Sequence, residues 1–271
     1  MIGPPDGARV FAPDGVVPLA WWATGVSRWH VEVTAQGRPW YSADLGAPTV
    51  KVRAPGGPLY RWRVIGPKGE ETVTWRTFQV VDSPRLDLRG AAGGAGRDGF
   101  TTGNGGERGQ DGGAARDLEV WVERVDGWVR VRTETVLGVK EALYLAPSSP
   151  PLIILAGGGA GGPGGSGANG MGAVVQGPGG PMAAAGPGAM GGDGGDGGAG
   201  ATVRLHTAAE LEDRVRIDVS GGEGGQGGLG GSGSIGAPGP RDTVIYGPPG
   251  APGANGRNGH VGPRGRVLRI P

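Results

Sequence analysis

Short stretches of alternating hydrophobic and polar residues dominate the first part of the chain. Trp29, Val31 and Val33, for example, would share one buried face of a strand. Turn signals rich in Gly and Pro separate about seven such stretches. The stretch 72–80 carries apolar residues on both faces, so the pattern does not decide which face is buried. The pattern predicts a small all-β domain over residues 1–81.

This predicted domain has two features of a known fold. About seven short strands in some eighty residues fit an immunoglobulin-like sandwich. The tryptophans Trp21 and Trp22, and the segment YRWRV at 60–64, make it resemble a fibronectin type III domain. The resemblance implies a spacer or attachment module, because such a fold carries no inherent chemistry.

Further strands are expected after residue 81, between and beside the glycine-rich runs described below. The strongest is a hairpin over 117–136, with Asp126-Gly127 as a two-residue turn. Residues 203–207 and 215–219 are expected to form another pair, joined by a turn or a single helical turn. The other predicted strands are 86–88, 141–145, 152–155, 243–246 and 267–270.

Glycine recurs at every third position in six runs, all after the predicted first domain. A period of three is that of the polyproline II helix, so the glycines of each run would line up as a bare stripe. Bare stripes let backbones approach closely and pair their N–H and C=O groups. The runs are 90–99, 103–112, 158–170, 186–200, 221–239 and 247–265. The predicted structural glycines are Gly158, Gly161, Gly164, Gly167, Gly191, Gly194, Gly197, Gly221, Gly224, Gly227, Gly230 and Gly233.

The expected fold class is therefore all-β plus polyglycine II. An immunoglobulin- or fibronectin-like sandwich over 1–81 precedes residues 82–271, a β platform that carries a bundle of polyglycine II helices. A strand is expected to lead into nearly every run. Most turns of 247–265 hold a single glycine, which predicts that this run lies at the edge of the bundle.

Three other structures are compatible with so much glycine. Collagen also needs glycine at every third residue, but in long arrays that strand-like segments do not interrupt. Flexible linkers are also rich in glycine, but a linker needs no fixed register, whereas these runs keep one. The segment GGDGGD at 191–196 matches half of a calcium-binding solenoid repeat, but no second copy follows.

Composition narrows the classes of function. The net charge of +1 argues against a nucleic-acid partner. No cysteine is present to form a disulfide or a thiolate site. The longest purely apolar run, 152–156, is too short to insert in a membrane. The first residues show no classical signal peptide.

Candidate catalytic chemistry is sparse, so we predict that the protein is not an enzyme and needs no cofactor or metal. His30, His206 and His260 stand in three separate segments, without the spacing of metal ligands. His30 is expected on the polar face of a strand. Asp193 and Asp196 would line one edge of a helix, where a solvated edge is favoured over a cation site.

Two interruptions between the runs are candidate binding loops. Both break the three-residue register, and the second, 171–185, is the most apolar of the connections between the predicted helices. Their candidate residues are Phe100 and Thr101 in the first, and Met171, Val174, Val175 and Met182 in the second.

The layout resembles glycine-rich polyglycine II proteins of two kinds. One is the tail-fibre-tip adhesins of T-even-type phages, which join a small attachment domain to a glycine-rich sandwich whose loops contact the host. The other is the snow-flea type of antifreeze protein. The first resemblance implies a structural and adhesive protein, with partner subunits of a fibre, filament or particle, a cell-surface ligand, and an extracellular or virion-surface location. A subunit of an extracellular filament or matrix, and an ice-binding protein, are the alternatives.

Overall fold

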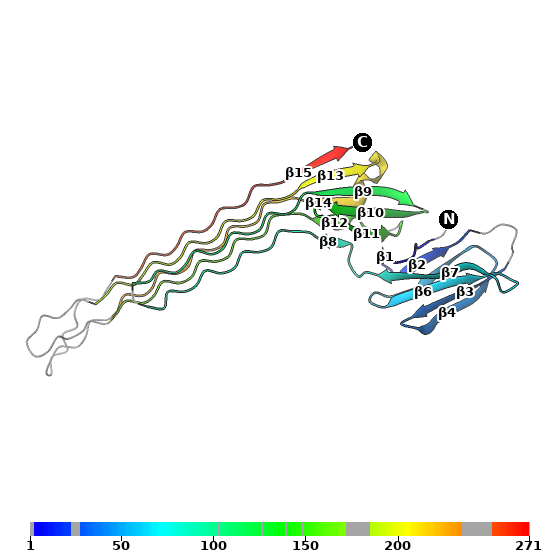
Figure 1. Ribbon diagram of the computed structural model, residues 1–271, viewed down its shortest axis with the longest axis horizontal. Helices are drawn as coiled ribbons and strands as arrows, with labels where there is room; N and C mark the ends of the chain where they lie inside the picture. Colours follow the sequence, from blue (N-terminus) through cyan, green and yellow to red (C-terminus); the bar gives the residue numbers. More distant parts are fainter. Residues whose placement is uncertain are drawn as a thin grey trace, which may run out of the picture.

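The protein is nearly all β, with about 40% of its described residues in strands and 3% in helix. The computed structural model describes residues 3–22, 28–101, 103–125, 127–138, 140–147, 149–171, 185–234 and 251–270. The strands gather in a head at one end, and the glycine-rich runs extend from it side by side (Figure 1). Within these ranges no helix has the length and apolar character needed to cross a membrane.

The described residues before 81 contain seven strands, which agrees with the number that the alternation predicted. Six of them surround a common core: a pair formed by β2 and β5 faces the part of the large sheet in the order β1-β7-β6-β3, and β4 lies at the sheet's edge. Trp29, Val31 and Val33 are buried on one face, which confirms the prediction for that stretch. The bounds are β1 Ala8–Phe11, β2 Val16–Ala20, β3 Trp29–Ala35, β4 Arg38–Leu45, β5 Thr49–Arg53, β6 Leu59–Ile65 and β7 Glu71–Val80.

A β-bulge explains why the inward side of 72–80 could not be assigned. Trp62 lies opposite Arg76, whereas Val64 lies opposite Val73, so β7 advances three residues while β6 advances two. The extra residue reverses which side chains of β7 face inward. Val73 is therefore buried before the bulge and Phe78 after it.

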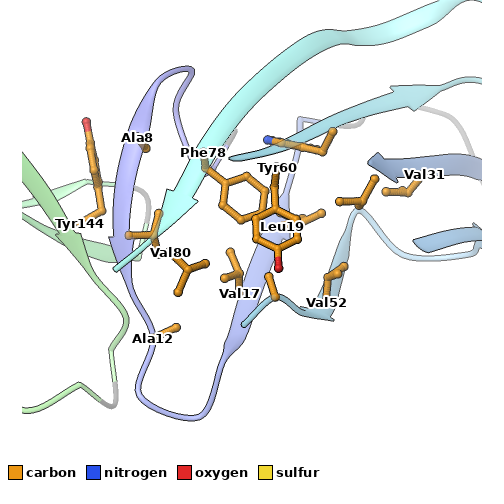
Figure 2. Packing of buried hydrophobic residues seen from close by; sticks show 14 of the residues in the cluster. Ala8, Ala12, Val17, Leu19, Val31, Val52, Tyr60, Phe78, Val80 and Tyr144 are labelled. Carbon is orange, nitrogen blue, oxygen red and sulfur yellow. The ribbon is translucent and has the colours of Figure 1, made fainter. Parts of the chain in front are cut away.

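Aromatic residues form the centre of this first core (Figure 2). Tyr60 and Phe78 are fully buried and stack with their ring centroids 5.1 Å apart. Val17, Leu19 and Val52 reach the same core from the facing pair β2–β5. Burying several side chains of this size accounts for a fold without disulfides, because each contributes roughly 1.5–3 kcal/mol.

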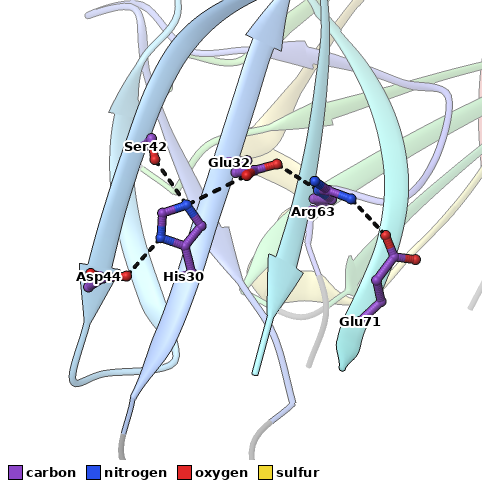
Figure 3. A network of polar contacts seen from close by, with 6 residues as sticks. All are labelled: His30, Glu32, Ser42, Asp44, Arg63 and Glu71. Carbon is purple, nitrogen blue, oxygen red and sulfur yellow. Dashed lines mark hydrogen bonds and ion pairs between the residues drawn. The ribbon is translucent and has the colours of Figure 1, made fainter. Parts of the chain in front are cut away.

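Polar contacts tie the outer strands of this region together (Figure 3). His30 Nδ1 lies 2.7 Å from Asp44 Oδ1, which links β3 to the edge strand β4. Arg63 on β6 donates to Glu32 at 2.6 Å and to Glu71 at 2.9 Å. His30 thus lies on the polar face, as predicted, but it is engaged by carboxylates and not only by water.

The second half of the head has two layers. The large sheet continues in the order β15-β13-β9-β10-β11, and β14-β12-β8 form a separate three-stranded sheet against it. The bounds are β8 Arg85–Asp87, β9 Leu118–Val125, β10 Trp128–Thr135, β11 Lys140–Leu145, β12 Leu152–Leu155, β13 Thr202–Thr207, β14 Val215–Asp218 and β15 Arg266–Ile270. The predicted hairpin is confirmed as β9–β10, although Asp126 lies outside the described residues, as does the predicted strand 243–246.

One strand pairing differs from the prediction. Residues 203–207 and 215–219 do not pair with each other. Strand β13 pairs with β9 and β15, whereas β14 pairs with β12 in the other layer. The short 3-10 helix η1, Ala209–Arg214, carries the chain between the layers, with Leu211 buried beneath it. A connection of this kind changes sheets, which strand periodicity alone does not reveal.

Strands from before and after residue 81 pair with each other in the one large sheet. Strand β1 pairs in parallel with β7 on one side and with β11 on the other. Two hydrophobic cores lie along this sheet. One lies against its N-terminal strands, and the other lies between strands β13, β9, β10 and β11 and the three-stranded sheet. Whether residues 1–81 form a separate domain stays a prediction.

Candidate functional site

The six glycine-rich runs are extended segments, called rods here and numbered along the chain. Their described residues are rod 1, 90–99; rod 2, 103–113; rod 3, 157–171; rod 4, 185–200; rod 5, 220–234; and rod 6, 251–265. Rods 1, 3 and 5 follow β8, β12 and β14, the three strands of the small sheet. Rods 2, 4 and 6 lead back into β9, β13 and β15 of the large sheet. The two sheets of the head thus continue as two layers of rods, which run side by side away from the head (Figure 1).

The expectation that a strand leads into nearly every run is therefore wrong for 103–112. That run follows a turn at the distal end of rod 1, the end away from the head, and returns toward β9. The reason lies in the connectivity: a chain that leaves the head along one rod must come back along the next. Strands consequently precede the outgoing rods and follow the returning rods.

Backbone hydrogen bonds join the rods at a step of three residues. Within a layer, Gly161 and Gly164 of rod 3 donate to the carbonyls of Glu223 and Gln226 in rod 5, each at 2.8 Å. Between layers, Gly195 of rod 4 donates to Gly162 of rod 3, also at 2.8 Å. The same pattern links every neighbouring pair of rods. The rods thus satisfy by mutual pairing the backbone groups that an extended segment cannot satisfy internally.

Side chains are excluded from the contacts between the rods. A Cβ at Gly227 would lie less than 3.0 Å from the carbonyl oxygen of Gly256. The predicted structural glycines Gly158, Gly161, Gly164, Gly167, Gly191, Gly194, Gly197, Gly221, Gly224, Gly227 and Gly230 all face a neighbouring carbonyl oxygen in this way. Gly233 lies partly buried near the distal end of rod 5.

The position of a rod determines how many glycines it needs in each turn. In rods 3, 4 and 5, two of every three residues point at neighbouring rods, which matches the repeated Gly-Gly-X of these runs. In rods 1, 2 and 6 mainly one residue in three does so. Over its described residues 251–265, rod 6 bonds to rods 4 and 5 and to no other rod, so the prediction that this run lies at an edge is confirmed for these residues.

Carboxylate and carboxamide side chains link neighbouring rods, a role that the sequence analysis missed. The outward residue of a turn has an N–H that points away from the backbone lattice. Asp98 accepts this N–H from Ser166 at 2.6 Å, and Asn169 accepts it from Ser232 at 2.9 Å. Pro163 occupies another outward position, where no N–H needs a partner. In the sequence, the signal for this role is an Asp or Asn in the preceding rod of the same layer, at the turn that lies beside the outward N–H.

Asp193 and Asp196 belong to this set of linking residues. Their Oδ1 atoms accept the backbone N–H groups of Arg257 and His260, each at 2.7 Å. Asp196 Oδ2 also accepts a hydrogen bond from Arg108 Nη2 at 3.0 Å. Across the described ranges no group of three acidic or histidine residues is arranged to hold a metal ion. Both carboxylates are thus engaged by rod 6, which explains their spacing of three residues.

Asp196 should make the bundle sensitive to acid. The N–H of His260 and the charge of Arg108 hold the pKa of Asp196 below the 3.8 of an ordinary aspartate. As the pH falls, the carboxylate of Asp196 is therefore protonated first in the unfolded chain. The stabilisation that it provides above pH 3.8 is lost progressively as the pH falls through the lower pKa of the folded protein. We expect the melting temperature of the wild type to fall more steeply than that of Asp196→Asn between about pH 5 and about pH 3. Parallel profiles would contradict this role, since asparagine keeps the acceptor but does not titrate.

Exposed apolar side chains gather toward the distal ends of the rods. Phe100 is 87% exposed and Met171 60%. Thr101 shapes the turn between rods 1 and 2, because its carbonyl accepts the N–H of Asn104 at 2.9 Å. Met190 and Leu229 are also exposed nearby. The other candidate loop residues, Val174, Val175 and Met182, lie outside the described residues.

The head carries one further group of polar residues, on the outer face of the large sheet. His206 Nε2 lies 3.2 Å from Glu119 Oε2, and its ring stacks on Trp121 with centroids 5.2 Å apart. Arg132 lies 4.2 Å from the same indole ring. Glu119 and Trp121 border a hollow of about 430 Å³ on the surface. The group is open to solvent, and the absence of enzymatic activity stays a prediction.

Comparison with known proteins adds little. No family model and no curated protein sequence matches the chain. One similar solved structure is the rhamnogalacturonan lyase YesW, with 15% identity, a TM-score of 0.25, and coverage of 50% of this chain and 23% of that one. Another is SGBP-B of the Bacteroides ovatus mixed-linkage glucan utilization locus, with 11% identity, a TM-score of 0.23, and coverage of 64% and 48%. The chain spans less than half the length of either protein.

Proposed function

We propose that this protein is a non-enzymatic structural and adhesive scaffold. In this proposal the six rods are polyglycine II helices that form a stiff shaft, and their distal ends present binding residues to a surface ligand. The architecture would then correspond to that of glycine-rich tail-fibre-tip adhesins. The observation that carries the proposal is the row of hydrogen bonds, repeated every third residue, that connects all six rods.

The two ends of the molecule support different roles. The described parts of rods 3 and 5 extend to Met171 and Ser234, and those of rods 4 and 6 start at Ala185 and Ala251, so outgoing and returning rods lie together far from the head. The N-terminal strands β2 to β6 lie at the opposite end (Figure 1). We propose that this immunoglobulin- or fibronectin-like part docks the protein to a larger assembly in an extracellular or particle-surface setting.

The distal apolar residues should matter for surface binding. We expect the double substitution Phe100→Ser and Met171→Ser to weaken binding to the target surface by at least about tenfold, because a well-buried apolar anchor contributes 2 kcal/mol or more. Val261→Ser is the matched control, since Val261 is 73% exposed but lies near the head. Binding of fluorescently labelled protein to whole cells gives the measurement. An equal loss in the control, or no loss in the double variant, would show that the distal ends do not bind the surface.

Electron microscopy of the purified protein tests the scaffold itself. The proposal predicts separate particles, each with a head and one thin shaft. The described parts of rods 3 to 6 hold 15 or 16 residues each, so the shaft should extend at least about 45 Å from the head at ~3.1 Å per residue. Extended filaments would favour the alternative of a filament or matrix subunit.

A further inference from the structure

The lattice of rods has an open side beside rods 5 and 6. Rod 3 shows what a glycine N–H of that layer normally binds, since Gly161 donates to the Glu223 carbonyl of the next rod. The equivalent N–H groups of rod 5 include those of Gly227 and Gly230. Among the described residues, no seventh rod lies beside rod 5 to offer them carbonyls.

Side chains from rod 6 take the place of those carbonyls. Asn258 Oδ1 accepts the N–H of Gly227 at 2.9 Å, and Asn255 Oδ1 accepts that of Gly230 at 2.9 Å. A carboxamide oxygen is the side-chain group most similar to a peptide carbonyl. The two asparagines are three residues apart, which is the step of the hydrogen bonds that they replace.

A carboxamide also caps one N–H group on the opposite side of the lattice. Gly94 of rod 1 has an N–H that faces the open side beside rods 1 and 2. Gln110 of rod 2 accepts this N–H through Oε1 at 3.3 Å. Both open sides therefore use a carboxamide from the corner rod of the other layer.

The same edge nearer the head lacks such acceptors. Val261 and Arg264 occupy the next two positions in the series that begins with Asn255 and Asn258. Among the described residues, Gly221 and Gly224 have no protein acceptor for their N–H groups. The closure therefore depends on which side chain stands at each position and not on the backbone alone.

We propose that Asn255 and Asn258 end the lattice at rod 6 and so prevent a rod of a second copy from joining it. An edge with free N–H groups and bare glycines would offer a rod of another molecule the same contacts that hold rods 3 and 5 together. Exposed strand edges recruit other chains for this reason, and proteins block them with side chains. The proposal goes beyond the scaffold role, since it explains how the shaft stays a single bundle.

Opening the edge should cause side-by-side association. In the triple variant Asn255→Gly, Asn258→Gly and Val261→Gly, two turns lose their caps and three consecutive turns lose the side chain that fills the edge. We expect its weight-average mass in sedimentation equilibrium to rise with concentration to at least twice that of the wild type. The matched control is Asn255→Val with Asn258→Val, which removes the acceptors but keeps the edge filled, and it should keep the wild-type mass. A triple variant that melts cooperatively yet keeps the wild-type mass at every concentration would overturn the proposal.

A single substitution tests the closure even if the triple variant does not fold. Val261→Asn places a carboxamide one turn from Asn258, opposite the free N–H of Gly224. We expect amide exchange at Gly224 to slow by up to about tenfold, the effect of one added hydrogen bond. Exchange at Gly227 should speed up by a similar factor in Asn258→Val. Unchanged exchange at both glycines would show that the carboxamides do not cap the edge.

Discussion

Gly227→Val is expected to lower the melting temperature by roughly 6–12 °C, which corresponds to a loss of about 3 kcal/mol or more for a chain of this size. The α-carbon of Gly227 faces rod 6, where a Cβ would collide with the carbonyl of Gly256. Relief of that collision requires the two rods to move apart. Several bonds between the rods would then weaken, each contributing about 0.5–1.5 kcal/mol. Differential scanning calorimetry measures the change.

Leu229→Ala is the matched control for this substitution. Leu229 is the outward residue of the same Gly-Gly-X turn and is 66% exposed. Its truncation removes little buried surface, so the melting temperature should change by no more than about 2 °C, because exposed substitutions usually stay within ±0.5 kcal/mol. If both variants melt within about a degree of the wild type, the rods are not a packed bundle and the adhesive function built on them fails too.

Ile154→Ala should be the other strongly destabilising change, at about 2–5 kcal/mol. Ile154 is fully buried in β12, the central strand of the three-stranded sheet. Rod 3 begins directly after β12, so loosening this strand also loosens the base of the bundle. We therefore expect the rods and the head to lose structure in one transition, detected together by circular dichroism and by the fluorescence of the head tryptophans.

Ile153→Ala separates burial from strand propensity in the same strand. Ile153 is the preceding residue, on the opposite face, and is 41% exposed. Its truncation should cost much less than that of Ile154, because fewer buried contacts are lost. An equal cost for the two variants would contradict the placement of the core. Rods that persist after the head unfolds would contradict the dependence of the bundle on its platform.

Much of the fold follows from two periodicities in the sequence. A period of two predicted the buried face of Trp29, Val31 and Val33, because strand side chains alternate between faces. A period of three in glycine predicted which residues face a neighbouring backbone. The doubled glycines of rods 3, 4 and 5 even distinguish them from the edge rod 6, because a doubled glycine marks a rod that turns two faces to neighbours.

The remaining features depend on contacts between distant segments. The separation of β13 from β14 into two layers depends on η1 and on pairing with β9 and β12, which local patterns do not encode. The bulge in β7 required the register of β6. The linking role of Asp196 needs rods 4 and 6 to be aligned first, since a carboxylate on one rod meets an N–H of another only at a fixed offset.

Hydrogen exchange of the glycine amides, measured by NMR, tests the central claim most directly. A packed bundle predicts strong protection of Gly161, Gly162, Gly164 and Gly165, whose N–H groups all bond to neighbouring rods. Their exchange should be at least about a thousandfold slower than in an unstructured peptide, since opening the bundle costs about 4 kcal/mol or more of a stability of 5–15 kcal/mol. Exchange of these four amides within about tenfold of the unstructured rate would show a flexible linker and contradict the account.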